Sequence, residues 1–319
     1  MGITGNLKRP LRWIFFCAGL LILGYFIAGS GILGNYRVFL TVNPLLYLLA
    51  VASTLAVLLM RTWRWRYLCT AYGTLISWRE SWVVSVSSLF YANITPGKIG
   101  DVYKAYFMQK GHGMCLADGV SMIFYERFFE LVILFLIACG VALTQLRGIT
   151  VVLLELVAII LVILLISYHK IDLVLDLVRR LSTRIPALAR ITPELQVRKI
   201  PPARIAGVLV ITLFSLGFDF LQIWIVALAF GYFLNPVLLT IFFSLSILAG
   251  LVSQIPLGVG VTEGSMSYLL TTMGVASADS LAIVLSSRLI SMYFVMALGF
   301  VFAKFAADRL DDGSTGASP

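Results

Sequence analysis

Charged residues are scarce in this sequence of 319 residues, because Asp, Glu, Lys and Arg together make up 12% of it while 60% is hydrophobic. The mean hydropathy of +0.99 lies far above that of soluble globular domains. No stretch is long and polar enough to form a sizeable soluble domain. The composition therefore excludes a soluble protein and predicts an all-α polytopic membrane protein, with residues 1–319 forming a single integral membrane domain.

Cysteine and histidine are also rare, with four and two residues, and neither occurs at a spacing typical of a disulfide framework or a zinc site. The sequence contains no Walker A loop, no paired carboxylates with Asp-rich spacing and no Ser/His/Asp arrangement. These absences argue against ATP-driven transport by this chain alone. We expect no metal, no cofactor, no catalytic residue and no enzymatic activity.

Apolar stretches long enough to cross a hydrocarbon core of roughly 30 Å recur along the chain. The first of them lacks a clear small-x-small cleavage site, so we interpret it as a retained helix rather than a signal peptide. Two further apolar segments, 81–110 and 237–276, are interrupted by proline and glycine. The six full spans are predicted at residues 12–33, 44–60, 117–144, 149–168, 205–231 and 280–304.

Acidic residues are outnumbered by basic ones, 15 to 24, and the basic residues collect in particular connections. The N-terminal segment, the connection after the second span and the connection 169–204 are all basic, and the last holds eight basic and three acidic residues. Because Lys and Arg resist translocation, we predict that these connections and both termini lie on the cytoplasmic side of the inner membrane. The net charge of +9 suits anionic lipid headgroups rather than nucleic acid.

The two interrupted segments share a register, which indicates an internal repeat. Pro96 is followed 31 residues later by Arg127, and Pro256 is followed 32 residues later by Arg288. In both copies an Ala-Asp pair ends nine residues before the arginine, and a glycine follows the proline at the fourth position. These matched features predict that the chain was built by duplication.

The charge-based orientation makes the two copies, 12–144 and 149–304, inverted relative to each other. Inverted repeats with broken helices near the midplane are typical of secondary transporters. The leading arm 81–95 would be only about 22 Å long, so we predict a re-entrant hairpin there. A second re-entrant hairpin is predicted at 237–276, although 237–255 is long enough to cross, and that alternative stays open.

The first break, NITPGKIGD at residues 93–101, should expose backbone groups that hydrocarbon does not satisfy. Helix N-termini after such breaks bind anions, and Lys98 and Lys104 would add positive charge to a phosphate site. Alternatively, the turn lies near the headgroups and its lysines extend to water. The residues of the two breaks are Pro96, Gly97, Gly100, Pro256, Gly258 and Gly260.

Arg127 and Arg288 lie about ten and about eight residues into their spans, which places both roughly 12–15 Å deep. An arginine at that depth costs about 2.5–3.5 kcal/mol on insertion scales, so each should face a partner or a water-filled cavity. Glu130 shares the helical face of Arg127 and offers a local neutralising pair. Arg288 has only serines around it and needs a distant acid, such as Glu263, or an anionic ligand.

Asp101 and Glu263 follow the two breaks at comparable offsets. They are candidates for proton carriers, cation ligands or helix N-terminal charges. Asp219 and Gln222 in the fifth span are weaker candidates. The predicted coupling or gating residues are Asp101, Glu126, Glu130 and Glu263, and the predicted substrate-binding residues are Lys98, Lys104, Arg127, Arg288, Asn93 and Gln254.

Five segments in order resemble the lysylphosphatidylglycerol synthase/flippase transmembrane family: RTWRWRYLCTAYG, NITPGKIGDVYKAY, IFYERFFEL, IPLGVGVTEG and SSRLI. The likeness covers residues 40–304, and it implies the flippase-like portion without the soluble aminoacyltransferase. Members are associated with moving lipids such as aminoacylated phospholipids, and with polyprenyl-linked sugar or hopanoid pathways. One departure is Lys98, because many relatives carry arginine there, and lysine is a less rigid phosphate ligand.

The favoured hypothesis is a flippase-like transporter that holds the phosphate of an anionic or zwitterionic lipid with basic residues between the two broken hairpins. The expected partners are the membrane lipid substrate, lipid-synthesis or glycosyltransferase enzymes, and further copies of the chain, but no nucleic acid. Two alternatives stay open. One is a membrane-embedded glycosyl or aminoacyl transferase, or its accessory subunit, that uses Asp101 or Glu263 as a base. The other is an ion-coupled solute transporter.

Overall fold

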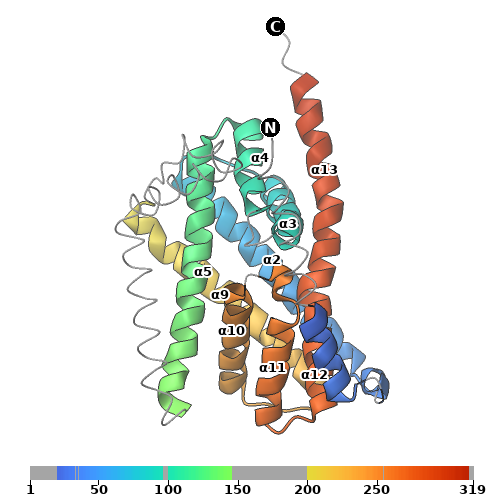
Figure 1. The fold of residues 1–319 in the computed structure, drawn as a ribbon. Coiled ribbons are helices and arrows are strands. Elements are labelled where there is room, and N and C mark those ends of the chain that lie inside the picture. The colour runs from blue at the N-terminus through green and yellow to red at the C-terminus, as the bar shows by residue number, and fades with distance from the viewer. Residues whose placement is uncertain are drawn as a thin grey trace, which may run out of the picture. The chain divides into compact units, whose positions relative to one another are not determined.

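A computed structural model of the chain describes residues 20–32, 34, 36–95, 100–145, 200–253 and 255–315, and all regular secondary structure in these ranges is helical (Figure 1). The predicted span 149–168, most of the connection 169–204 and four candidate residues, Pro96, Gly97, Lys98 and Gln254, lie outside the described ranges. In chain order the elements are η1 (Tyr36–Leu40), α2 (Pro44–Ala71), α3 (Trp78–Ile94), α4 (Val102–His112), α5 (Leu116–Gln145), α9 (Pro202–Ala229), α10 (Pro236–Val252), η4 (Pro256–Gly258), α11 (Val261–Thr272), α12 (Ser277–Arg288), η5 (Leu289–Phe294) and α13 (Val295–Thr315).

The predicted all-α class is confirmed. Among the described residues, three helices are long and apolar enough to cross a membrane, and they span Pro44–Ala71, Ala203–Ala229 and Ser277–Phe305. Helix α5 covers the predicted span 117–144. The chain is therefore a helical protein with membrane-length apolar helices, as its composition indicates.

The second predicted span is too short, because α2 does not end near residue 60 but continues to Ala71. The segment RTWRWRYLCTA, interpreted as part of a connection, forms the last three turns of this helix. The helix ends where Gly73 adopts a φ of +83° and Thr74 N–H donates to the Cys69 carbonyl at 2.9 Å, which closes the last turn. No glycine or proline stands between Pro44 and Gly73 to stop the helix earlier.

The helices form two compact units, and each unit is assembled from separate stretches of the chain. Unit 1 is drawn from residues 1–57, 90–100 and 216–297, and unit 2 from residues 58–89, 101–215 and 298–319. Each unit has its own buried hydrophobic cluster.

In unit 1, α10, α11 and α12 pack side by side (Figure 1). Their buried side chains include Leu239, Met266 and Ile283, one from each helix. Gly250 of α10 permits the close approach of α11, because a Cβ at this position would lie 2.2 Å from the Thr262 hydroxyl.

In unit 2, α4 packs against α5, and the core contains Trp65, Met108 and Met122 from α2, α4 and α5. A Cβ on Gly119 of α5 would lie 2.6 Å from that of Ala105, so the glycine brings α4 close to α5. This tight contact holds the charged side chains of the two helices within ion-pairing distance.

Both interrupted segments contain a break between two helices, at the predicted places. The first separates α3 from α4, and Thr95 spans it by accepting the Gly100 N–H at 2.7 Å while donating to the Tyr91 carbonyl at 2.9 Å. The second separates α10 from α11 and places Leu257 at a φ of 63°, a left-handed conformation that is costly for a residue other than glycine. Each interrupted segment thus consists of two helices separated by a break.

Candidate functional site

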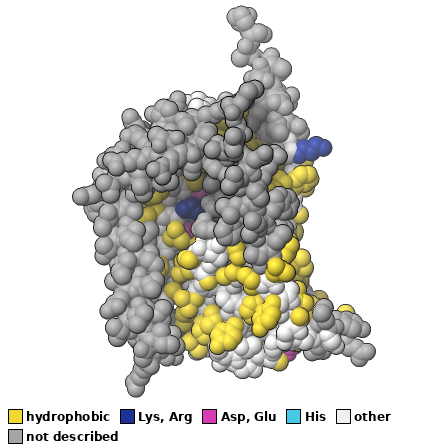
Figure 2. All heavy atoms as spheres, viewed as in Figure 1, with side chains coloured by type: hydrophobic (Ala, Val, Ile, Leu, Met, Phe, Trp, Pro, Cys, Tyr) yellow, Lys and Arg dark blue, Asp and Glu magenta, His cyan; other side chains and the backbone are white. Residues whose placement is uncertain are grey.

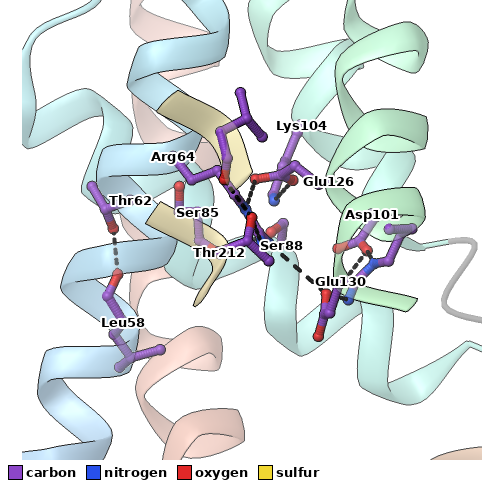
Figure 3. A network of polar contacts seen from close by, with 12 residues as sticks. Leu58, Thr62, Arg64, Ser85, Ser88, Asp101, Lys104, Glu126, Glu130 and Thr212 are labelled. Carbon is purple, nitrogen blue, oxygen red and sulfur yellow. Dashed lines mark hydrogen bonds and ion pairs between the residues drawn. The ribbon is translucent and has the colours of Figure 1, made fainter. Parts of the chain in front are cut away.

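Six charged side chains in unit 2 form one chain in which positive and negative groups alternate (Figure 3). They come from α2, from α5 and from α4 with the residue just before it. The order along the chain of contacts is Lys104, Glu126, Arg64, Glu130, Arg127 and Asp101. We call this set the charge chain.

The inner end of the charge chain is buried. Glu126 receives Lys104 Nζ at 2.7 Å on one carboxylate oxygen and Arg64 Nε at 3.2 Å on the other. Arg64 also donates from Nη1 to the Thr212 hydroxyl of α9 at 3.2 Å. The ammonium of Lys104 lies 5.0 Å from the centre of the Trp65 ring, a cation–π arrangement that further stabilises the buried charge. The contacts of Lys104 and Arg64 given above are therefore made with side chains of the protein.

The outer end of the charge chain is more accessible. Arg127 donates from Nη1 to Glu130 at 2.9 Å and from Nε to Asp101 at 2.8 Å, and its Nη2 also contacts Asp101. Glu130 in turn lies 3.9 Å from Arg64 Nη2, which joins this end to the inner one. The exposed fraction of the side chain is 26% for Arg127 and 14% for Glu130, whereas it is 2% for Glu126. A ligand would therefore reach the charge chain at Arg127 and Glu130.

The formal charges of the charge chain sum to zero, because three cations face three carboxylates. Charges in a low-dielectric interior persist only when they are paired and hydrogen-bonded. Replacing a buried ion pair by apolar residues is often neutral or stabilising, so stability alone gives weak grounds for keeping six charges here. The charge chain is therefore a candidate functional site within the apolar helices.

Unit 1 contains a smaller counterpart around the second break. Arg288 donates from Nε to Glu263 at 2.7 Å and from Nη2 to the carbonyl of Leu257 at 2.7 Å. The second oxygen of Glu263 accepts the Gly260 N–H at 2.7 Å. Arg288 and Glu263 thus hold the left-handed turn at Leu257 in place.

The helix that carries Arg288 changes its winding directly after it. Residues Leu289–Phe294 form a π-helix, which is frequent at functional sites. Two carbonyls just before it accept side-chain donors: Ser286 from the Tyr47 hydroxyl and Ser287 from the Gln222 amide, each at 3.3 Å. Gln222, one of the weaker candidates from the sequence, is therefore buried and contacts the helix directly before its π-helical segment.

The acid–arginine pairs of the two units match in sequence separation. Asp101 precedes its arginine by 26 residues, and Glu263 precedes its arginine by 25. In both cases the acid stands at or within the first turn of the helix after the break. This equivalence agrees with the repeat register seen in the sequence.

Most predicted site residues are brought into these two clusters. Lys104, Arg127, Asp101, Glu126 and Glu130 meet in unit 2, and Glu263 is the acid that pairs with Arg288 in unit 1. Asn93 is half-buried in the last turn of α3, and no described contact connects it to either cluster.

Sequence reasoning missed Arg64 and Thr212. Arg64 was assigned to a connection, yet it is 3% exposed and central to the charge chain. The signal that could have found it is the absence of any helix breaker before Gly73, which places Arg64 inside the helix. Thr212 gives no such signal, because a single threonine in an apolar span is ordinary.

Comparisons with known proteins agree with this architecture. Residues 12–299 match the family described as the lysylphosphatidylglycerol synthase TM region. A UPF0104 membrane protein of Methanothermobacter thermautotrophicus (strain Delta H) is 26% identical over 327 aligned residues, which cover 94% of this chain and 95% of that protein. Because the family match extends over nearly the whole chain, the chain belongs to the lysylphosphatidylglycerol synthase transmembrane-region family.

Proposed function

We propose that this membrane protein is a flippase-like transporter that moves an anionic or zwitterionic lipid across the membrane by alternating access. The substrate class is a phospholipid or a polyprenyl-phosphate-linked lipid. The observation that carries the proposal is that an acid–arginine pair follows each of the two helix breaks, one pair in each unit, within otherwise apolar helices. Ionisable groups at such places are costly and are typical of substrate pathways. Family membership supports the membrane setting.

In unit 2 the headgroup docks at the outer end of the charge chain. Arg127 offers a planar fork that suits phosphate, and Glu130 beside it offers a carboxylate for a positive group. Because the charge chain sums to zero, a zwitterionic headgroup leaves no uncompensated charge. Lys104 acts through Glu126, which it contacts directly, and Arg288 has the corresponding headgroup role in unit 1.

Only the polar head needs shelter during this movement, since the hydrocarbon chains of the substrate remain in the bilayer. Displacement of Asp101 from Arg127 by a phosphate would free one end of α4 from α5. This exchange supplies a physical link between headgroup binding and a change of helix position.

The topology that belongs to this proposal has six spans and two re-entrant hairpins in inverted repeats over 12–144 and 149–304. Both termini lie on the cytoplasmic side of the inner membrane. In this topology the tips of the hairpins lie at the two helix breaks, between α3 and α4 and between α10 and α11. Enzymes that make or consume the lipid are the proposed partners.

A membrane-embedded transferase is the second candidate, and it would need Asp101 or Glu263 as a base. Both carboxylates are already engaged by an arginine, and Glu263 is further held by a backbone N–H. This engagement favours transport over catalysis.

The test is lipid movement in proteoliposomes that contain the full chain and a phospholipid with a fluorescent headgroup. Replacing Arg288 by alanine should slow movement at least about tenfold, equivalent to about 1.4 kcal/mol. Arg288→Lys should give a rate of lipid movement between those of the wild type and Arg288→Ala. Lysine keeps the charge but loses the planar guanidinium that donates to both Glu263 and Leu257. Arg204→Ala is the matched control, since that exposed arginine contacts the Tyr67 ring outside both clusters. A folded Arg288→Ala protein with unchanged movement would contradict the proposal.

A further inference from the structure

A groove between α5 and α9 in unit 2 is lined entirely by aliphatic side chains and has a volume of about 380 Å³. Helix α5 and helix α9 each contribute three of them. The lining residues are Ile133, Leu136, Ile137, Leu209, Val210 and Leu213.

The groove begins one helical turn beyond Glu130, which belongs to the outer end of the charge chain. On α5, Ile133 and Ile137 stand three and seven residues after Glu130, so all three share one helical face. On α9, Leu209 and Leu213 stand three residues before and one residue after Thr212, whose hydroxyl accepts a hydrogen bond from Arg64. At 1.5 Å per residue the groove extends from about 5 to about 10 Å beyond Glu130 along α5.

The walls of the groove are open, whereas its charged end is only partly open. Leu136, Val210 and Leu213 are each about half exposed. On the face shown in Figure 2, basic and acidic side chains reach the surface beside hydrophobic ones. Glu130, whose side chain is 14% exposed, stands one turn of α5 before Ile133, the first residue on that helix that lines the apolar groove.

Charge complementarity decides which occupant fits. An apolar helix from a second copy would cover the aliphatic walls but would place hydrocarbon against Arg127 and Glu130, which is unfavourable. A lipid brings a polar head together with each apolar chain, so it satisfies both parts at once. The spacing of about 5–10 Å from Glu130 suits the first carbons of a chain attached to a headgroup at that residue.

We propose that this groove holds one hydrocarbon chain of the lipid whose headgroup docks at Arg127 and Glu130. The inference rests on the proposed function and adds a chain-binding subsite to it. Substrate selection then depends on the chain as well as the head: a two-chain long-acyl phospholipid is bound at the groove, and its dihexanoyl analogue is bound only weakly.

The groove is tested with phosphatidylethanolamine that carries a photoreactive diazirine in one oleoyl-length chain, in proteoliposomes of the full chain. Wild-type protein should be labelled on the α5 and α9 residues of the groove, and excess unlabelled dioleoyl lipid, but not dihexanoyl lipid, should reduce the labelling. Leu213→Trp or Ile137→Trp, which fill the groove from opposite walls, should lower it at least about fivefold. Phe214→Trp is the matched control, because Phe214 is exposed on the same helix but does not line the groove.

Each outcome separates this inference from the proposed function. Labelling that is equal in Leu213→Trp and Phe214→Trp, or that no lipid reduces, reports bulk bilayer contact and overturns the groove site. A disulfide between two copies of a Leu213→Cys protein also overturns it, because a second copy then occupies the groove. If the wild type moves lipid and Leu213→Trp moves it equally fast, the transport function stands and the subsite is wrong. Saturable groove labelling without any lipid movement supports the site and contradicts transport.

Discussion

At the scale of single residues, Glu126 has the most demanding position in the protein as described. It is 2% exposed and stands between two cations, Arg64 and Lys104, that are themselves buried. Desolvation of three charges is compensated only while all three remain in contact. The three side chains at the inner end of the charge chain therefore stabilise the protein jointly rather than as separate pairs.

Glu126→Gln should lower the free energy of unfolding by about 3–5 kcal/mol, because it removes the ion pair of buried Lys104 and leaves buried Arg64 only the 3.9 Å contact with Glu130. The measurement is chemical unfolding of the purified protein in detergent. Glu126→Gln combined with Lys104→Met should recover part of the loss, since it removes one of the two charges. Glu130→Gln, at a more exposed position, should cost less; equal costs at the two glutamates would refute this account.

At the scale of elements, the two breaks are stabilised by different hydrogen bonds, but both are followed by the same arrangement of an acid and an arginine. Thr95 spans the first through its hydroxyl, while Arg288 and Glu263 hold the second through a carbonyl and an amide. Both place an acid at the start of the following helix, where the helix dipole favours negative charge. The acid then reaches the arginine of the next long helix.

The first break depends on the absence of a side chain at Gly100. A Cβ there would lie 2.1 Å from the Tyr91 carbonyl oxygen, which is backbone and has no room to move. Gly100→Ala should therefore destabilise the protein by about 1–3 kcal/mol, as measured by thermal or chemical unfolding. Gly111→Ala inside α4 meets nothing closer than 3.9 Å and should stabilise by up to about 1 kcal/mol. The same sign for both variants would be inconsistent with a close backbone contact at the break.

At the scale of the whole molecule, the acid–arginine pair that follows the first break lies in unit 2, and the pair that follows the second break lies in unit 1. A transporter with inverted repeats needs such a duplicated polar element, because its two access states exchange the conformations of the repeats. The proposed topology predicts which turns of the chain face each side of the membrane.

Cys115, an exposed thiol in the turn between α4 and α5, should react with a membrane-impermeant maleimide only after the cells are made permeable. A thiol introduced as Phe233→Cys, in the exposed turn between α9 and α10, should react in intact cells. Mass spectrometry of the labelled peptides measures both. Labelling of the two sites from the same side would show that the repeats are not inverted.

Local information in the sequence accounts for much of this protein. Composition predicts the helical membrane class, because only helices with internally bonded backbones survive in hydrocarbon at this hydropathy. Proline and glycine mark both breaks, and their spacing to Arg127 and Arg288 identifies the repeat register. Each of these properties depends on neighbours within about one repeat, so the order of residues is sufficient to reveal it.

The sequence predicted the Arg127–Glu130 pair and offered Glu263 to Arg288, but only the tertiary structure decided which charges meet at the inner end of the charge chain. Arg64 lies 62 residues from Glu126 and 148 from Thr212, and no helical period relates positions so far apart. The apolar groove beside them likewise exists only because α5 and α9, which are separated in the chain, pack against each other. Contacts between distant segments follow from how helices pack, and for that reason the sequence determined the breaks and the ionisable residues while the fold determined the charge chain and its groove.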